Sequence, residues 1–558
     1  MKEAIAKVLV KKIDLKKEEI LSLIEIPPEM QLGDFAFPCF VLAKSMKKAP
    51  GEIAKELSEK LSKNLPEGIS ELKAEGPYLN FFTDKTKLVE KVLESVKEDD
   101  WGRSKIKNQK IMIEFSQPNT HKAFHVGHIR GTSLGESIAR ISEFFGNKTI
   151  RANYSGDTGM HIAKWIWCYK NFHEEEGLKE EESWIASIYV DAVKRLEKNP
   201  EAQKEVNKIN NHIEKKDNKV INSLWEKTRK LSIRSWDKIY LELGTHFDRQ
   251  YFESEVELPG KEIALKLLEK KIAKKSEGAV IMNFRKDNLG VFVLLRSDGT
   301  VLYSAKDIAL AKLKSKDYNC DKHITTIGDE QKHHGEQVVK TLKKMKFSNA
   351  KNYLFLPFGM VRLSTGKMSS RTGDNILYSD FMKEITDYTK ERISEKSMKV
   401  SKKEIEKRAL KVSVAAIKYS MLKQDPRKVI IFDKKEALKF EGDTGPYLLY
   451  SYARASSILR KVKSKAKIKI KNLEDGEVAL VKKIDDFPSV VENAYTHLAP
   501  NLIANYSYEL SQIFNEFYHS CPVMGSEKES FRLKLVDSFR KTLKKSLELL
   551  GIETLEEM

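Results

Sequence analysis

The chain has 558 residues, enough for about three to four domains, and a hydrophobic share of 41% excludes an intrinsically disordered protein. Lysine and arginine number 100 against 81 aspartate and glutamate residues, a formal charge of +19. This excess favours a polyanionic partner, with nucleic acid first, although an ordinary lysine-rich surface is the alternative explanation.

Neither membrane insertion nor export is expected. No run of about 18 apolar residues occurs, and the amphipathic N-terminus lacks the apolar core of a signal peptide. The four cysteines are far apart and form no C-x-x-C pair, which argues against a zinc ribbon and a disulfide scaffold. These features predict a cytoplasmic protein without a structural metal.

The N-terminal part, residues 1–100, combines helical periodicity with apolar, aromatic stretches at 31–40 and 75–82. This mixture predicts a small α+β domain. The polar stretch 98–109 is interpreted as a linker.

An α/β domain is predicted for residues 105–385. A strand at 110–116, an amphipathic helix from about 127 to 145 and a strand at 148–155 form a βαβ unit, which requires a parallel sheet. Residues from about 165 to 320 interrupt this alternation of strands and helices and are interpreted as an insertion.

The βα alternation resumes with strands at 323–331 and 352–363, and residues 386–558 are almost entirely helical in periodicity. The predicted fold class is multidomain α/β. It comprises a Rossmann-like parallel-sheet catalytic domain with an insertion, a small α+β N-terminal domain and a C-terminal all-α helical bundle.

The most informative motif, SQPNTHKAFHVGHIRG (116–131), lies between the first strand of the α/β domain and its helix. Ligands of open α/β sheets bind at this end of the strands. His125 and His128 flank Gly127 at the helix start, where free N–H groups and the helix dipole favour phosphate. An isolated H-x-G-H is equally consistent with two helix-start histidines that bind nothing.

A second motif, LSTGKMSSRTGD (363–374), follows the last predicted strand of the α/β domain. Its Lys367 can reach a phosphate as a mobile cation, and the alternative is an ordinary surface loop. The two motifs, about 240 residues apart, are more specific together than either is alone.

The pair resembles the HIGH and KMSKS signatures of class I aminoacyl-tRNA synthetases, and the chain is similar in particular to the arginyl-tRNA synthetase family. The resemblance covers almost the whole chain and rests on these segments: EFSQPNTHKAFHVGHIRGTSLGESIARI (114–141), NYSGDTGMHIAKW (153–165), DGTVLYSAKDIALA (298–311), IGDEQKHHGEQV (327–338), GKMSSRTGD (366–374), FDKKEALKFEGDTGPYLLYSYAR (432–454) and YELSQIFNEFYHSCPV (508–523).

The resemblance implies an arginine–tRNA ligase of protein biosynthesis. Such an enzyme uses ATP, with Mg²⁺ bound to the nucleotide, to convert L-arginine to arginyl-adenylate, and transfers the arginyl group to the 3′-terminal ribose of tRNA(Arg). It also implies that activation needs bound tRNA. We expect tRNA(Arg), L-arginine and ATP as partners, no membrane, and a monomer.

The family's arginine contacts fall on Glu114, Asn119, Tyr303, Asp307 and Gln331. A guanidinium has five donors in a planar fork, which carboxylates match well. Tyr303 and Asp307 are four residues apart and share a face if they lie on a helix. Without the surrounding motif, Asp307 would be interpreted as a solvated helix residue and Tyr303 as a core aromatic.

The family's ATP contacts fall on Lys122, His125, Gly127, His128, Lys367, Met368 and Ser369. Catalytic stabilisation of the triphosphate charge is expected from Lys122, His125, His128 and Lys367. One departure matters: the usual K-M-S-K-S is here K-M-S-S-R, with Ser370 in place of the second lysine. We expect Lys122 to compensate, with Arg371 as the alternative.

Contacts with tRNA are also implied by the resemblance. The domain at 1–100 is expected to bind the tRNA elbow near the D-loop through Tyr78 and Asn80, and the domain at 386–558 to bind the anticodon. The candidate anticodon contacts are Tyr506, Phe514 and Met558. Packing in a hydrophobic core is the alternative for the aromatic residues.

Three other functions stay open at this point. A different class I synthetase would keep both signatures, but Glu114 and Asp307 argue against it. A small-molecule nucleotidyltransferase would not need the long helical region after the second signature. A non-catalytic tRNA-binding paralogue is the alternative from another functional class, and the nearly complete signatures argue against it.

Overall fold

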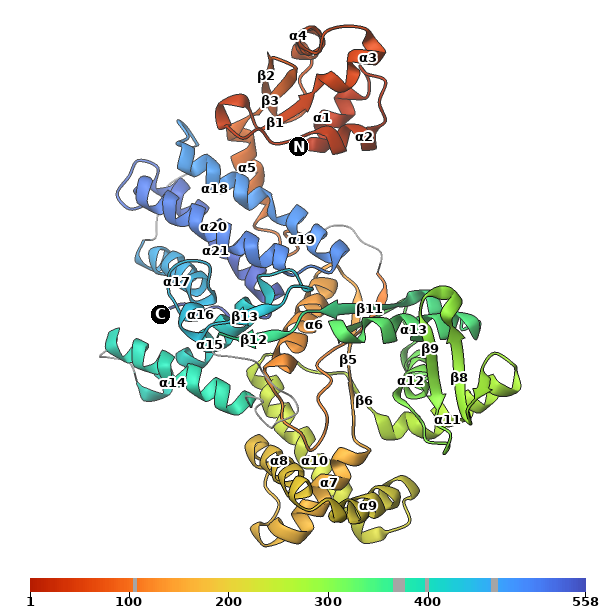
Figure 1. Cartoon of the computed structure of the whole chain (residues 1–558). Coiled ribbons are helices and arrows are strands. Elements are labelled where there is room, and N and C mark those ends of the chain that lie inside the picture. Colours follow the sequence, from red (N-terminus) through yellow and green to blue (C-terminus); the bar gives the residue numbers. More distant parts are fainter. Residues whose placement is uncertain (104–107, 365–376, 397–400, 463–469) are drawn as a thin grey trace. The chain divides into compact units, whose positions relative to one another are not determined.

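The computed structural model describes residues 1–103, 108–364, 377–396, 401–462 and 470–558 (Figure 1). The chain divides into two compact units. The first comprises Met1–Trp101, Ile458–Asp486 and Gln512–Lys541, and the second comprises Gly102–Ser457, Phe487–Ser511 and Thr542–Met558.

The N-terminal region is α+β, as predicted. Its antiparallel sheet has the order β1-β3-β2, with β1 (Phe35–Pro38), β2 (Ile69–Glu75) and β3 (Tyr78–Thr83). The helices of this region are α1 (Lys2–Leu9), α2 (Lys17–Leu23), α3 (Ala43–Met46), α4 (Pro50–Ser62) and α5 (Lys85–Ser95). Alternation along β3 buries Leu79 and Phe81 against Ile5, Ile53 and Leu57, which forms the core of this region.

A five-stranded parallel sheet lies at the centre of the second unit, with the order β11-β10-β4-β5-β6. Its strands are β4 (Lys110–Glu114), β5 (Lys148–Ser155), β6 (Arg249–Phe252), β10 (Lys322–Gly328) and β11 (Tyr353–Phe358). The strand order reverses between β4 and β10, so the loops that follow these two strands diverge there. In open α/β sheets, this switch point at the carboxyl edge is where ligands bind.

Helix α6 (Val126–Phe144) connects β4 to β5 and confirms the helix predicted from about 127 to 145. It packs very closely against the chain that leaves β4, because a Cβ atom at Gly135 would lie 2.1 Å from Cγ of Phe115. Glycine is therefore required at this contact, and it brings the start of α6 close to the carboxyl edge of the sheet.

The stretch expected as one insertion, from about 165 to 320, contains a strand of the central sheet, because β6 pairs with β5. Before β6 lie four helices, which we call the helical insertion: α7 (Met160–Cys168), α8 (Glu182–Lys198), α9 (Gln203–Lys215) and α10 (Lys219–Glu242). Trp165, Ile188 and Trp225 are buried in its own core. After β6 come α11 (Glu253–Glu269), β7 (Lys274–Ser276), β8 (Ala279–Phe284), β9 (Gly290–Leu295) and α12 (Tyr303–Tyr318).

The rest of the chain is mainly helical, as predicted. Helix α13 (Lys332–Lys344) lies between β10 and β11. The later helices are α14 (Tyr378–Lys396), α15 (Lys402–Leu422), α16 (Lys434–Ala437), α17 (Gly445–Lys461), α18 (Asp475–Asp485), α19 (Phe487–His497), α20 (Asn501–Ser520) and α21 (Glu529–Leu549). One exception is β13 (Ile430–Phe432), which pairs in parallel with β12 (Val361–Leu363).

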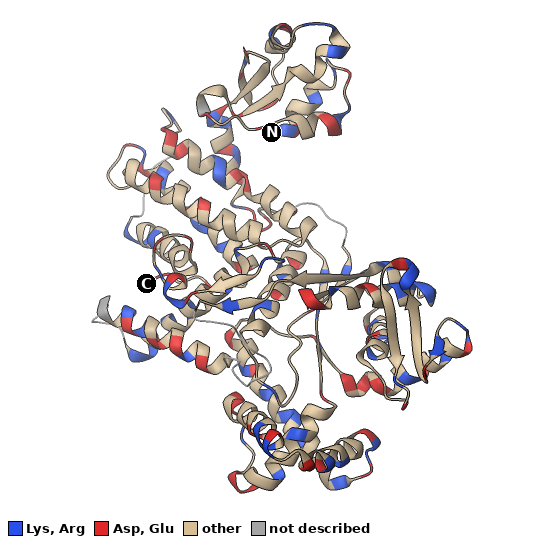
Figure 2. Cartoon of the chain, viewed as in Figure 1, with Lys and Arg blue, Asp and Glu red and all other residues tan. Residues whose placement is uncertain are grey.

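Basic and acidic residues both occur on most of the helices. Figure 2 shows lysines and arginines beside aspartates and glutamates on these elements. None of the described helices has both the length and the apolar character needed to cross a bilayer.

Candidate active site

A cavity of about 750 Å³ opens at the switch point of the central sheet. Its walls come from the chain after β4, the start of α6, one face of α12 and the turn between β10 and α13. Eight of the predicted site residues line it: Glu114, Asn119, His125, Gly127, His128, Tyr303, Asp307 and Gln331. The predicted contacts Lys367, Met368 and Ser369 lie outside the described residues.

The HVGH turn fixes the tautomers of its two histidines. His125 is the N-cap of α6, and its Nδ1 accepts a hydrogen bond of 3.1 Å from the backbone N–H of Gly127. Nδ1 of His128 accepts one of 3.1 Å from the backbone N–H of His125. A neutral imidazole that accepts at Nδ1 carries its proton on Nε2. Both rings therefore offer an Nε2–H donor.

Burial keeps both rings neutral. Burial and the nearby charge of Lys122 lower the pKa of His125 to about 4, and burial lowers the pKa of His128 well below its usual value. The ring centroids lie 3.9 Å apart. At pH 7 the turn thus presents two neutral donors at fixed positions, which suits the stabilisation of charge that develops on phosphate oxygens.

The loop that precedes α6 is strained and is held by α10 of the helical insertion. Ser116, Gln117 and His121 have φ values of +79°, +52° and +63°, a region that costs about 1 kcal/mol or more for a non-glycine residue. Two contacts to α10 hold this conformation. Ser116 Oγ shares a hydrogen bond of 2.9 Å with Tyr240 OH, and His121 N–H donates one of 3.0 Å to Ser232 Oγ.

Lys122, the expected substitute for the missing lysine, lies in the same loop but is not among the residues that line the cavity. Its ammonium lies 5.4 Å from the ring centroid of Tyr189 on α8, a cation–π contact. Burial and the charge of Lys164 lower its pKa. Its role at the triphosphate stays a prediction.

The carboxylates expected to bind arginine already have cationic or hydrogen-bond partners. Glu114 is 3% exposed, forms an ion pair with Lys314 of α12 and accepts a hydrogen bond from Gln117. Asp307 Oδ2 lies 2.5 Å from His334 Nε2 of α13. Sequence reasoning gave Lys314 no role and considered His334 only as a poor metal ligand. Lys314 lies seven residues after Asp307, so both residues are on the same face of one helix. This spacing could have indicated that Lys314 also faces the site.

Three of the predicted tRNA contacts are buried. The exposed fractions of Asn80, Tyr506 and Phe514 are 3%, 2% and 0%. The ring of Phe514 stacks on that of Phe539 with the centroids 3.8 Å apart. Burial of Tyr506 and Phe514 agrees with core packing, the alternative for the aromatic residues. Contact of these three side chains with tRNA stays a prediction. Tyr78 is half-buried and packs edge-on against Phe40.

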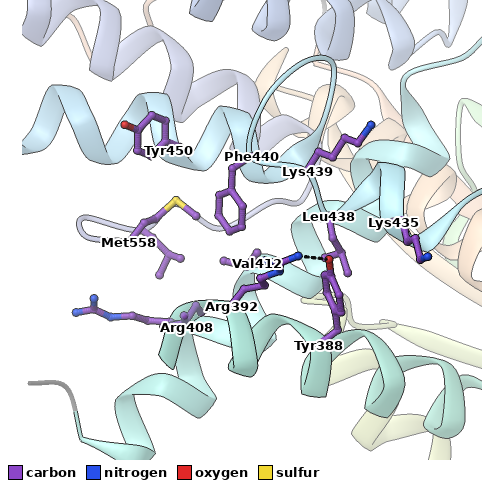
Figure 3. Close-up of a pocket in the computed structure, with 12 residues that line it drawn as sticks. Tyr388, Arg392, Arg408, Val412, Lys435, Leu438, Lys439, Phe440, Tyr450 and Met558 are labelled. Carbon is purple, nitrogen blue, oxygen red and sulfur yellow. Dashed lines mark hydrogen bonds between the residues drawn. The ribbon is translucent and has the colours of Figure 1, made fainter. Parts of the chain in front are cut away.

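Met558 does line a pocket. This second cavity, of about 290 Å³, lies between α14, α15 and α17 and is closed by the C-terminal residues (Figure 3). Its wall combines Tyr388, Phe440 and Tyr450 with Arg392. Aromatic faces beside a guanidinium form a surface on which a nucleobase can stack.

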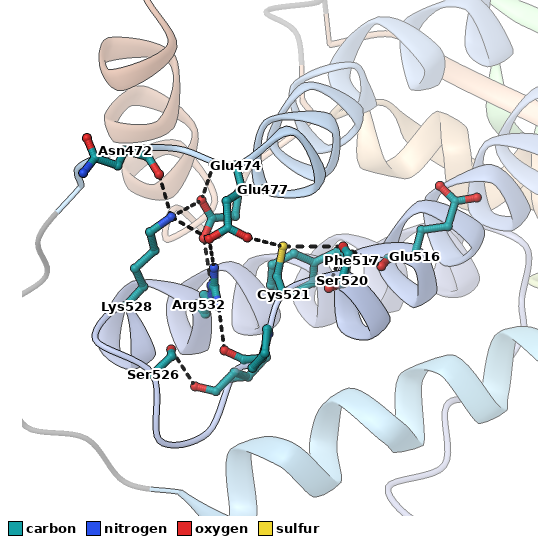
Figure 4. Close-up of polar contacts among 12 residues, drawn as sticks. Asn472, Glu474, Glu477, Glu516, Phe517, Ser520, Cys521, Ser526, Lys528 and Arg532 are labelled. Carbon is teal, nitrogen blue, oxygen red and sulfur yellow. Dashed lines mark hydrogen bonds and ion pairs between the residues drawn. The ribbon is translucent and has the colours of Figure 1, made fainter.

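Two groups of described residues bring three potential metal ligands within 4.8 Å of one another: Cys168, His173 and Asp191, and Glu474, Glu477 and Cys521. In both groups, cationic side chains already contact the carboxylates. Arg195 Nε lies 2.6 Å from Asp191 Oδ2. Lys528 and Arg532 pair with Glu474 and Glu477 (Figure 4). Ion pairing therefore accounts for the carboxylates in both groups.

Comparison with known families agrees with the fold and the cavity. Residues 89–433 match the family "tRNA synthetases class I (R), catalytic domain", residues 448–558 match "DALR anticodon binding domain", and residues 1–83 match "Arginyl tRNA synthetase N terminal domain". The parallel sheet with the HVGH turn at its switch point is thus a class I aminoacyl-tRNA synthetase catalytic domain.

Individual relatives define the family more closely. The chain is 38% identical over 571 residues to the arginine–tRNA ligase of Clostridium perfringens and 37% identical over 566 residues to that of Clostridium acetobutylicum, in each case over 100% of both proteins. It matches the structure of Thermus thermophilus arginyl-tRNA synthetase with a TM-score of 0.83 at 28% identity, covering 100% of this chain and 99% of that one. The chain belongs to the arginyl-tRNA synthetase family, a family of aminoacyl-tRNA ligases.

Proposed function

We propose that this chain activates L-arginine with ATP and transfers the arginyl group to the 3′-terminal ribose of tRNA(Arg). The observation that carries the proposal is the composition of the cavity at the switch point. One wall has two neutral Nε2–H donors, and another has Tyr303 and Asp307 on one face of α12. Phosphates and a guanidinium can therefore be held side by side.

In the activation step, a carboxylate oxygen of arginine attacks the α-phosphorus of ATP in line, and pyrophosphate leaves. No protein nucleophile is required, so the site acts by positioning and by charge stabilisation. His125 and His128 donate hydrogen bonds from Nε2–H to phosphate oxygens. Lys122 and Lys367 supply positive charge. Mg²⁺ arrives with ATP as part of the substrate.

In the transfer step, the 2′-hydroxyl of the terminal ribose attacks the carbonyl carbon of arginyl-adenylate, and AMP leaves. We propose that activation itself requires bound tRNA. The pocket around Met558 supports the use of the helical region in binding an unpaired tRNA base.

The proposal includes a cytoplasmic monomer. The four cysteines are buried and unpaired, which suits a reducing compartment. Light scattering coupled to size-exclusion chromatography tests the oligomeric state, with a single species of one chain mass expected.

Charging of purified tRNA with each of the twenty amino acids tests the activity. Formation of arginyl-tRNA alone is the expected result. Charging with another amino acid would contradict the specificity. Tight tRNA binding with no charging at all would favour the non-catalytic paralogue.

A further inference from the structure

A buried carboxylate in the helical insertion bridges two backbone segments beside the active-site cavity. Glu182 begins α8 and is 8% exposed. Its Oε1 accepts a hydrogen bond of 3.1 Å from the backbone N–H of Phe124, the residue before His125. Its Oε2 accepts one of 3.0 Å from the backbone N–H of Ser379, in the first turn of α14. One side chain thus joins the HVGH turn to α14.

The two bridged segments also contact each other directly. His125 and Leu377 form an antiparallel bridge, and the backbone N–H of Tyr378 donates a hydrogen bond of 2.8 Å to the carbonyl oxygen of Phe124. The rings of Phe124 and Tyr378 meet edge to face with centroids 6.0 Å apart. In sequence, Leu377 follows shortly after the motif GKMSSRTGD (366–374). Glu182 therefore stabilises a junction between chain segments that adjoin both signature motifs.

The chemistry of the junction requires a carboxylate. The backbone N–H groups of Phe124, which is buried, and of Ser379, which is half-buried, each need an acceptor. An ionised carboxylate is the side chain that offers two acceptor oxygens without a donor. Glutamine would supply one acceptor and turn an NH₂ group toward the other N–H. Burial raises the pKa of Glu182, against the effect of these hydrogen bonds. The carboxylate thus carries a desolvation cost, which its hydrogen bonds to the two backbone positions partly offset.

A second contact from the same helix reaches the same loop. Tyr189 lies seven residues after Glu182, so both residues are on one face of α8. Its ring receives the ammonium of Lys122, as described above. Helix α8 therefore contacts the loop before α6 at Lys122 and at Phe124, the residues on either side of Ala123.

We propose that Glu182 is a positioning residue for amino-acid activation, which holds the HVGH turn against the start of α14. The Nε2 donors of His125 and His128 then stand at fixed positions before ATP binds. The proposal rests on the proposed function and assigns the helical insertion a task in catalysis. Glu182 acts through the backbone of its neighbours and not by contact with the substrate.

The test compares Glu182→Gln with Glu181→Gln, a matched change at the exposed adjacent residue. Pyrophosphate exchange in the presence of tRNA(Arg) gives kcat and the KM values for ATP and arginine, and circular dichroism gives the folded fraction. For Glu182→Gln we expect kcat per folded molecule to fall at least about tenfold, because small displacements of catalytic groups have effects of this size. The KM for arginine should stay within about twofold, since Tyr303 and Asp307 belong to a different wall of the cavity. Glu181→Gln should match the wild type.

Three outcomes would overturn the proposal. The first is an unchanged kcat in folded Glu182→Gln. The second is a change in kcat matched by an equal change in the KM for arginine, which indicates a general loss of structure. The third is loss of folding at 25 °C in both Glu182→Gln and Glu182→Asp, where the aspartate keeps the carboxylate on a shorter side chain. Glu182 would then contribute to stability only. A different result would refute the proposed function itself. In that case the wild type and all the variants would bind tRNA, but even the wild type would not catalyse exchange.

Discussion

The two sides of the active-site cavity meet opposite electrostatic demands in different ways. On the phosphate side, His125 and His128 are neutral, and backbone hydrogen bonds fix their tautomers. On the arginine side, Glu114 and Asp307 are paired with Lys314 and His334. A polyanion can be met by fixed dipoles without any charge on the protein, whereas a guanidinium needs carboxylates, which are costly to bury alone.

The two sides therefore differ in whether contacts within the protein must be replaced before a ligand binds. On the proposed phosphate side, the donors are already oriented, and no hydrogen bond among the described residues uses Nε2 of His125 or His128. In the proposed binding mode, an incoming guanidinium takes over contacts that Lys314 and His334 make with Glu114 and Asp307. The next four predictions test this contrast, from the largest expected effect to the smallest, and a fifth concerns the stability of the fold in acid.

Replacement of His125 by alanine removes one Nε2 donor and the N-cap of α6. The rate of pyrophosphate exchange in the presence of tRNA(Arg) should fall by a factor of about 100 to 1,000, as for other losses of a donor to transition-state charge. Binding of tRNA should persist. His333→Ala, at an exposed position of α13, is the control. A His125→Ala enzyme with wild-type exchange would refute the assignment of the phosphate side.

Replacement of Lys314 by methionine leaves Glu114 buried without its cation. The free energy of unfolding should fall by about 3 kcal/mol, since an uncompensated buried charge is strongly destabilising. Arginine should restore stability in this variant more than in the wild type, because its guanidinium no longer competes with Lys314. Thermal unfolding with and without arginine measures both effects. Equal stabilisation of the two proteins by arginine would show that the guanidinium does not reach Glu114.

Replacement of Asp307 by asparagine removes the more accessible of the two carboxylates, whose side chain is 24% exposed against 4% for Glu114. The KM for arginine should rise about 30-fold, equivalent to about 2 kcal/mol for a charged hydrogen bond, while the KM for ATP stays unchanged. Glu336→Gln, an exposed change on α13, should have neither effect. If the KM for ATP rises and the KM for arginine does not, Asp307 belongs to the ATP-binding side of the cavity and the assignment is wrong.

Replacement of Lys122 by alanine tests compensation for Ser370. Exchange should slow about tenfold, the order expected for loss of one screened cation near a triphosphate, with a smaller effect for Arg371→Ala. Steady-state kinetics at saturating arginine distinguishes the two variants. If Lys122→Ala has full activity and Arg371→Ala does not, Arg371 is the compensating residue.

Acid should weaken the fold through buried histidines. Burial lowers the pKa of His121 to about 3, against a usual value of 6.5. The unfolded chain therefore takes up protons as the pH falls below 6.5, while the folded chain does not. The contribution is fully present above pH 6.5 and is lost toward pH 3, at about 1.4 kcal/mol per pH unit for each such histidine. Denaturant titrations between pH 7 and pH 4 should show a shallower slope for His121→Gln, and an unchanged slope would contradict this account.

Local patterns predicted the elements that carry the signature motifs. The βαβ unit of β4, α6 and β5 follows from apolar strands and a clear helical period. Strand β6 was not predicted, because its four residues RQYF have no period and pair only through a long-range contact. Spacing placed Tyr506 and Phe514 on helices but could not distinguish a core face from a binding face. Glu182 belongs to an acidic run that predicts solvent exposure, and the tertiary fold alone selects this residue for burial.

The central claim is that this cavity activates arginine, and only arginine, with ATP. Pyrophosphate exchange with each of the twenty amino acids, with and without tRNA(Arg), tests it most directly. The account predicts exchange with arginine alone and only when tRNA is present. Exchange without tRNA would remove the proposed coupling and keep the enzyme. No exchange under any condition, with tRNA binding intact, would contradict the account.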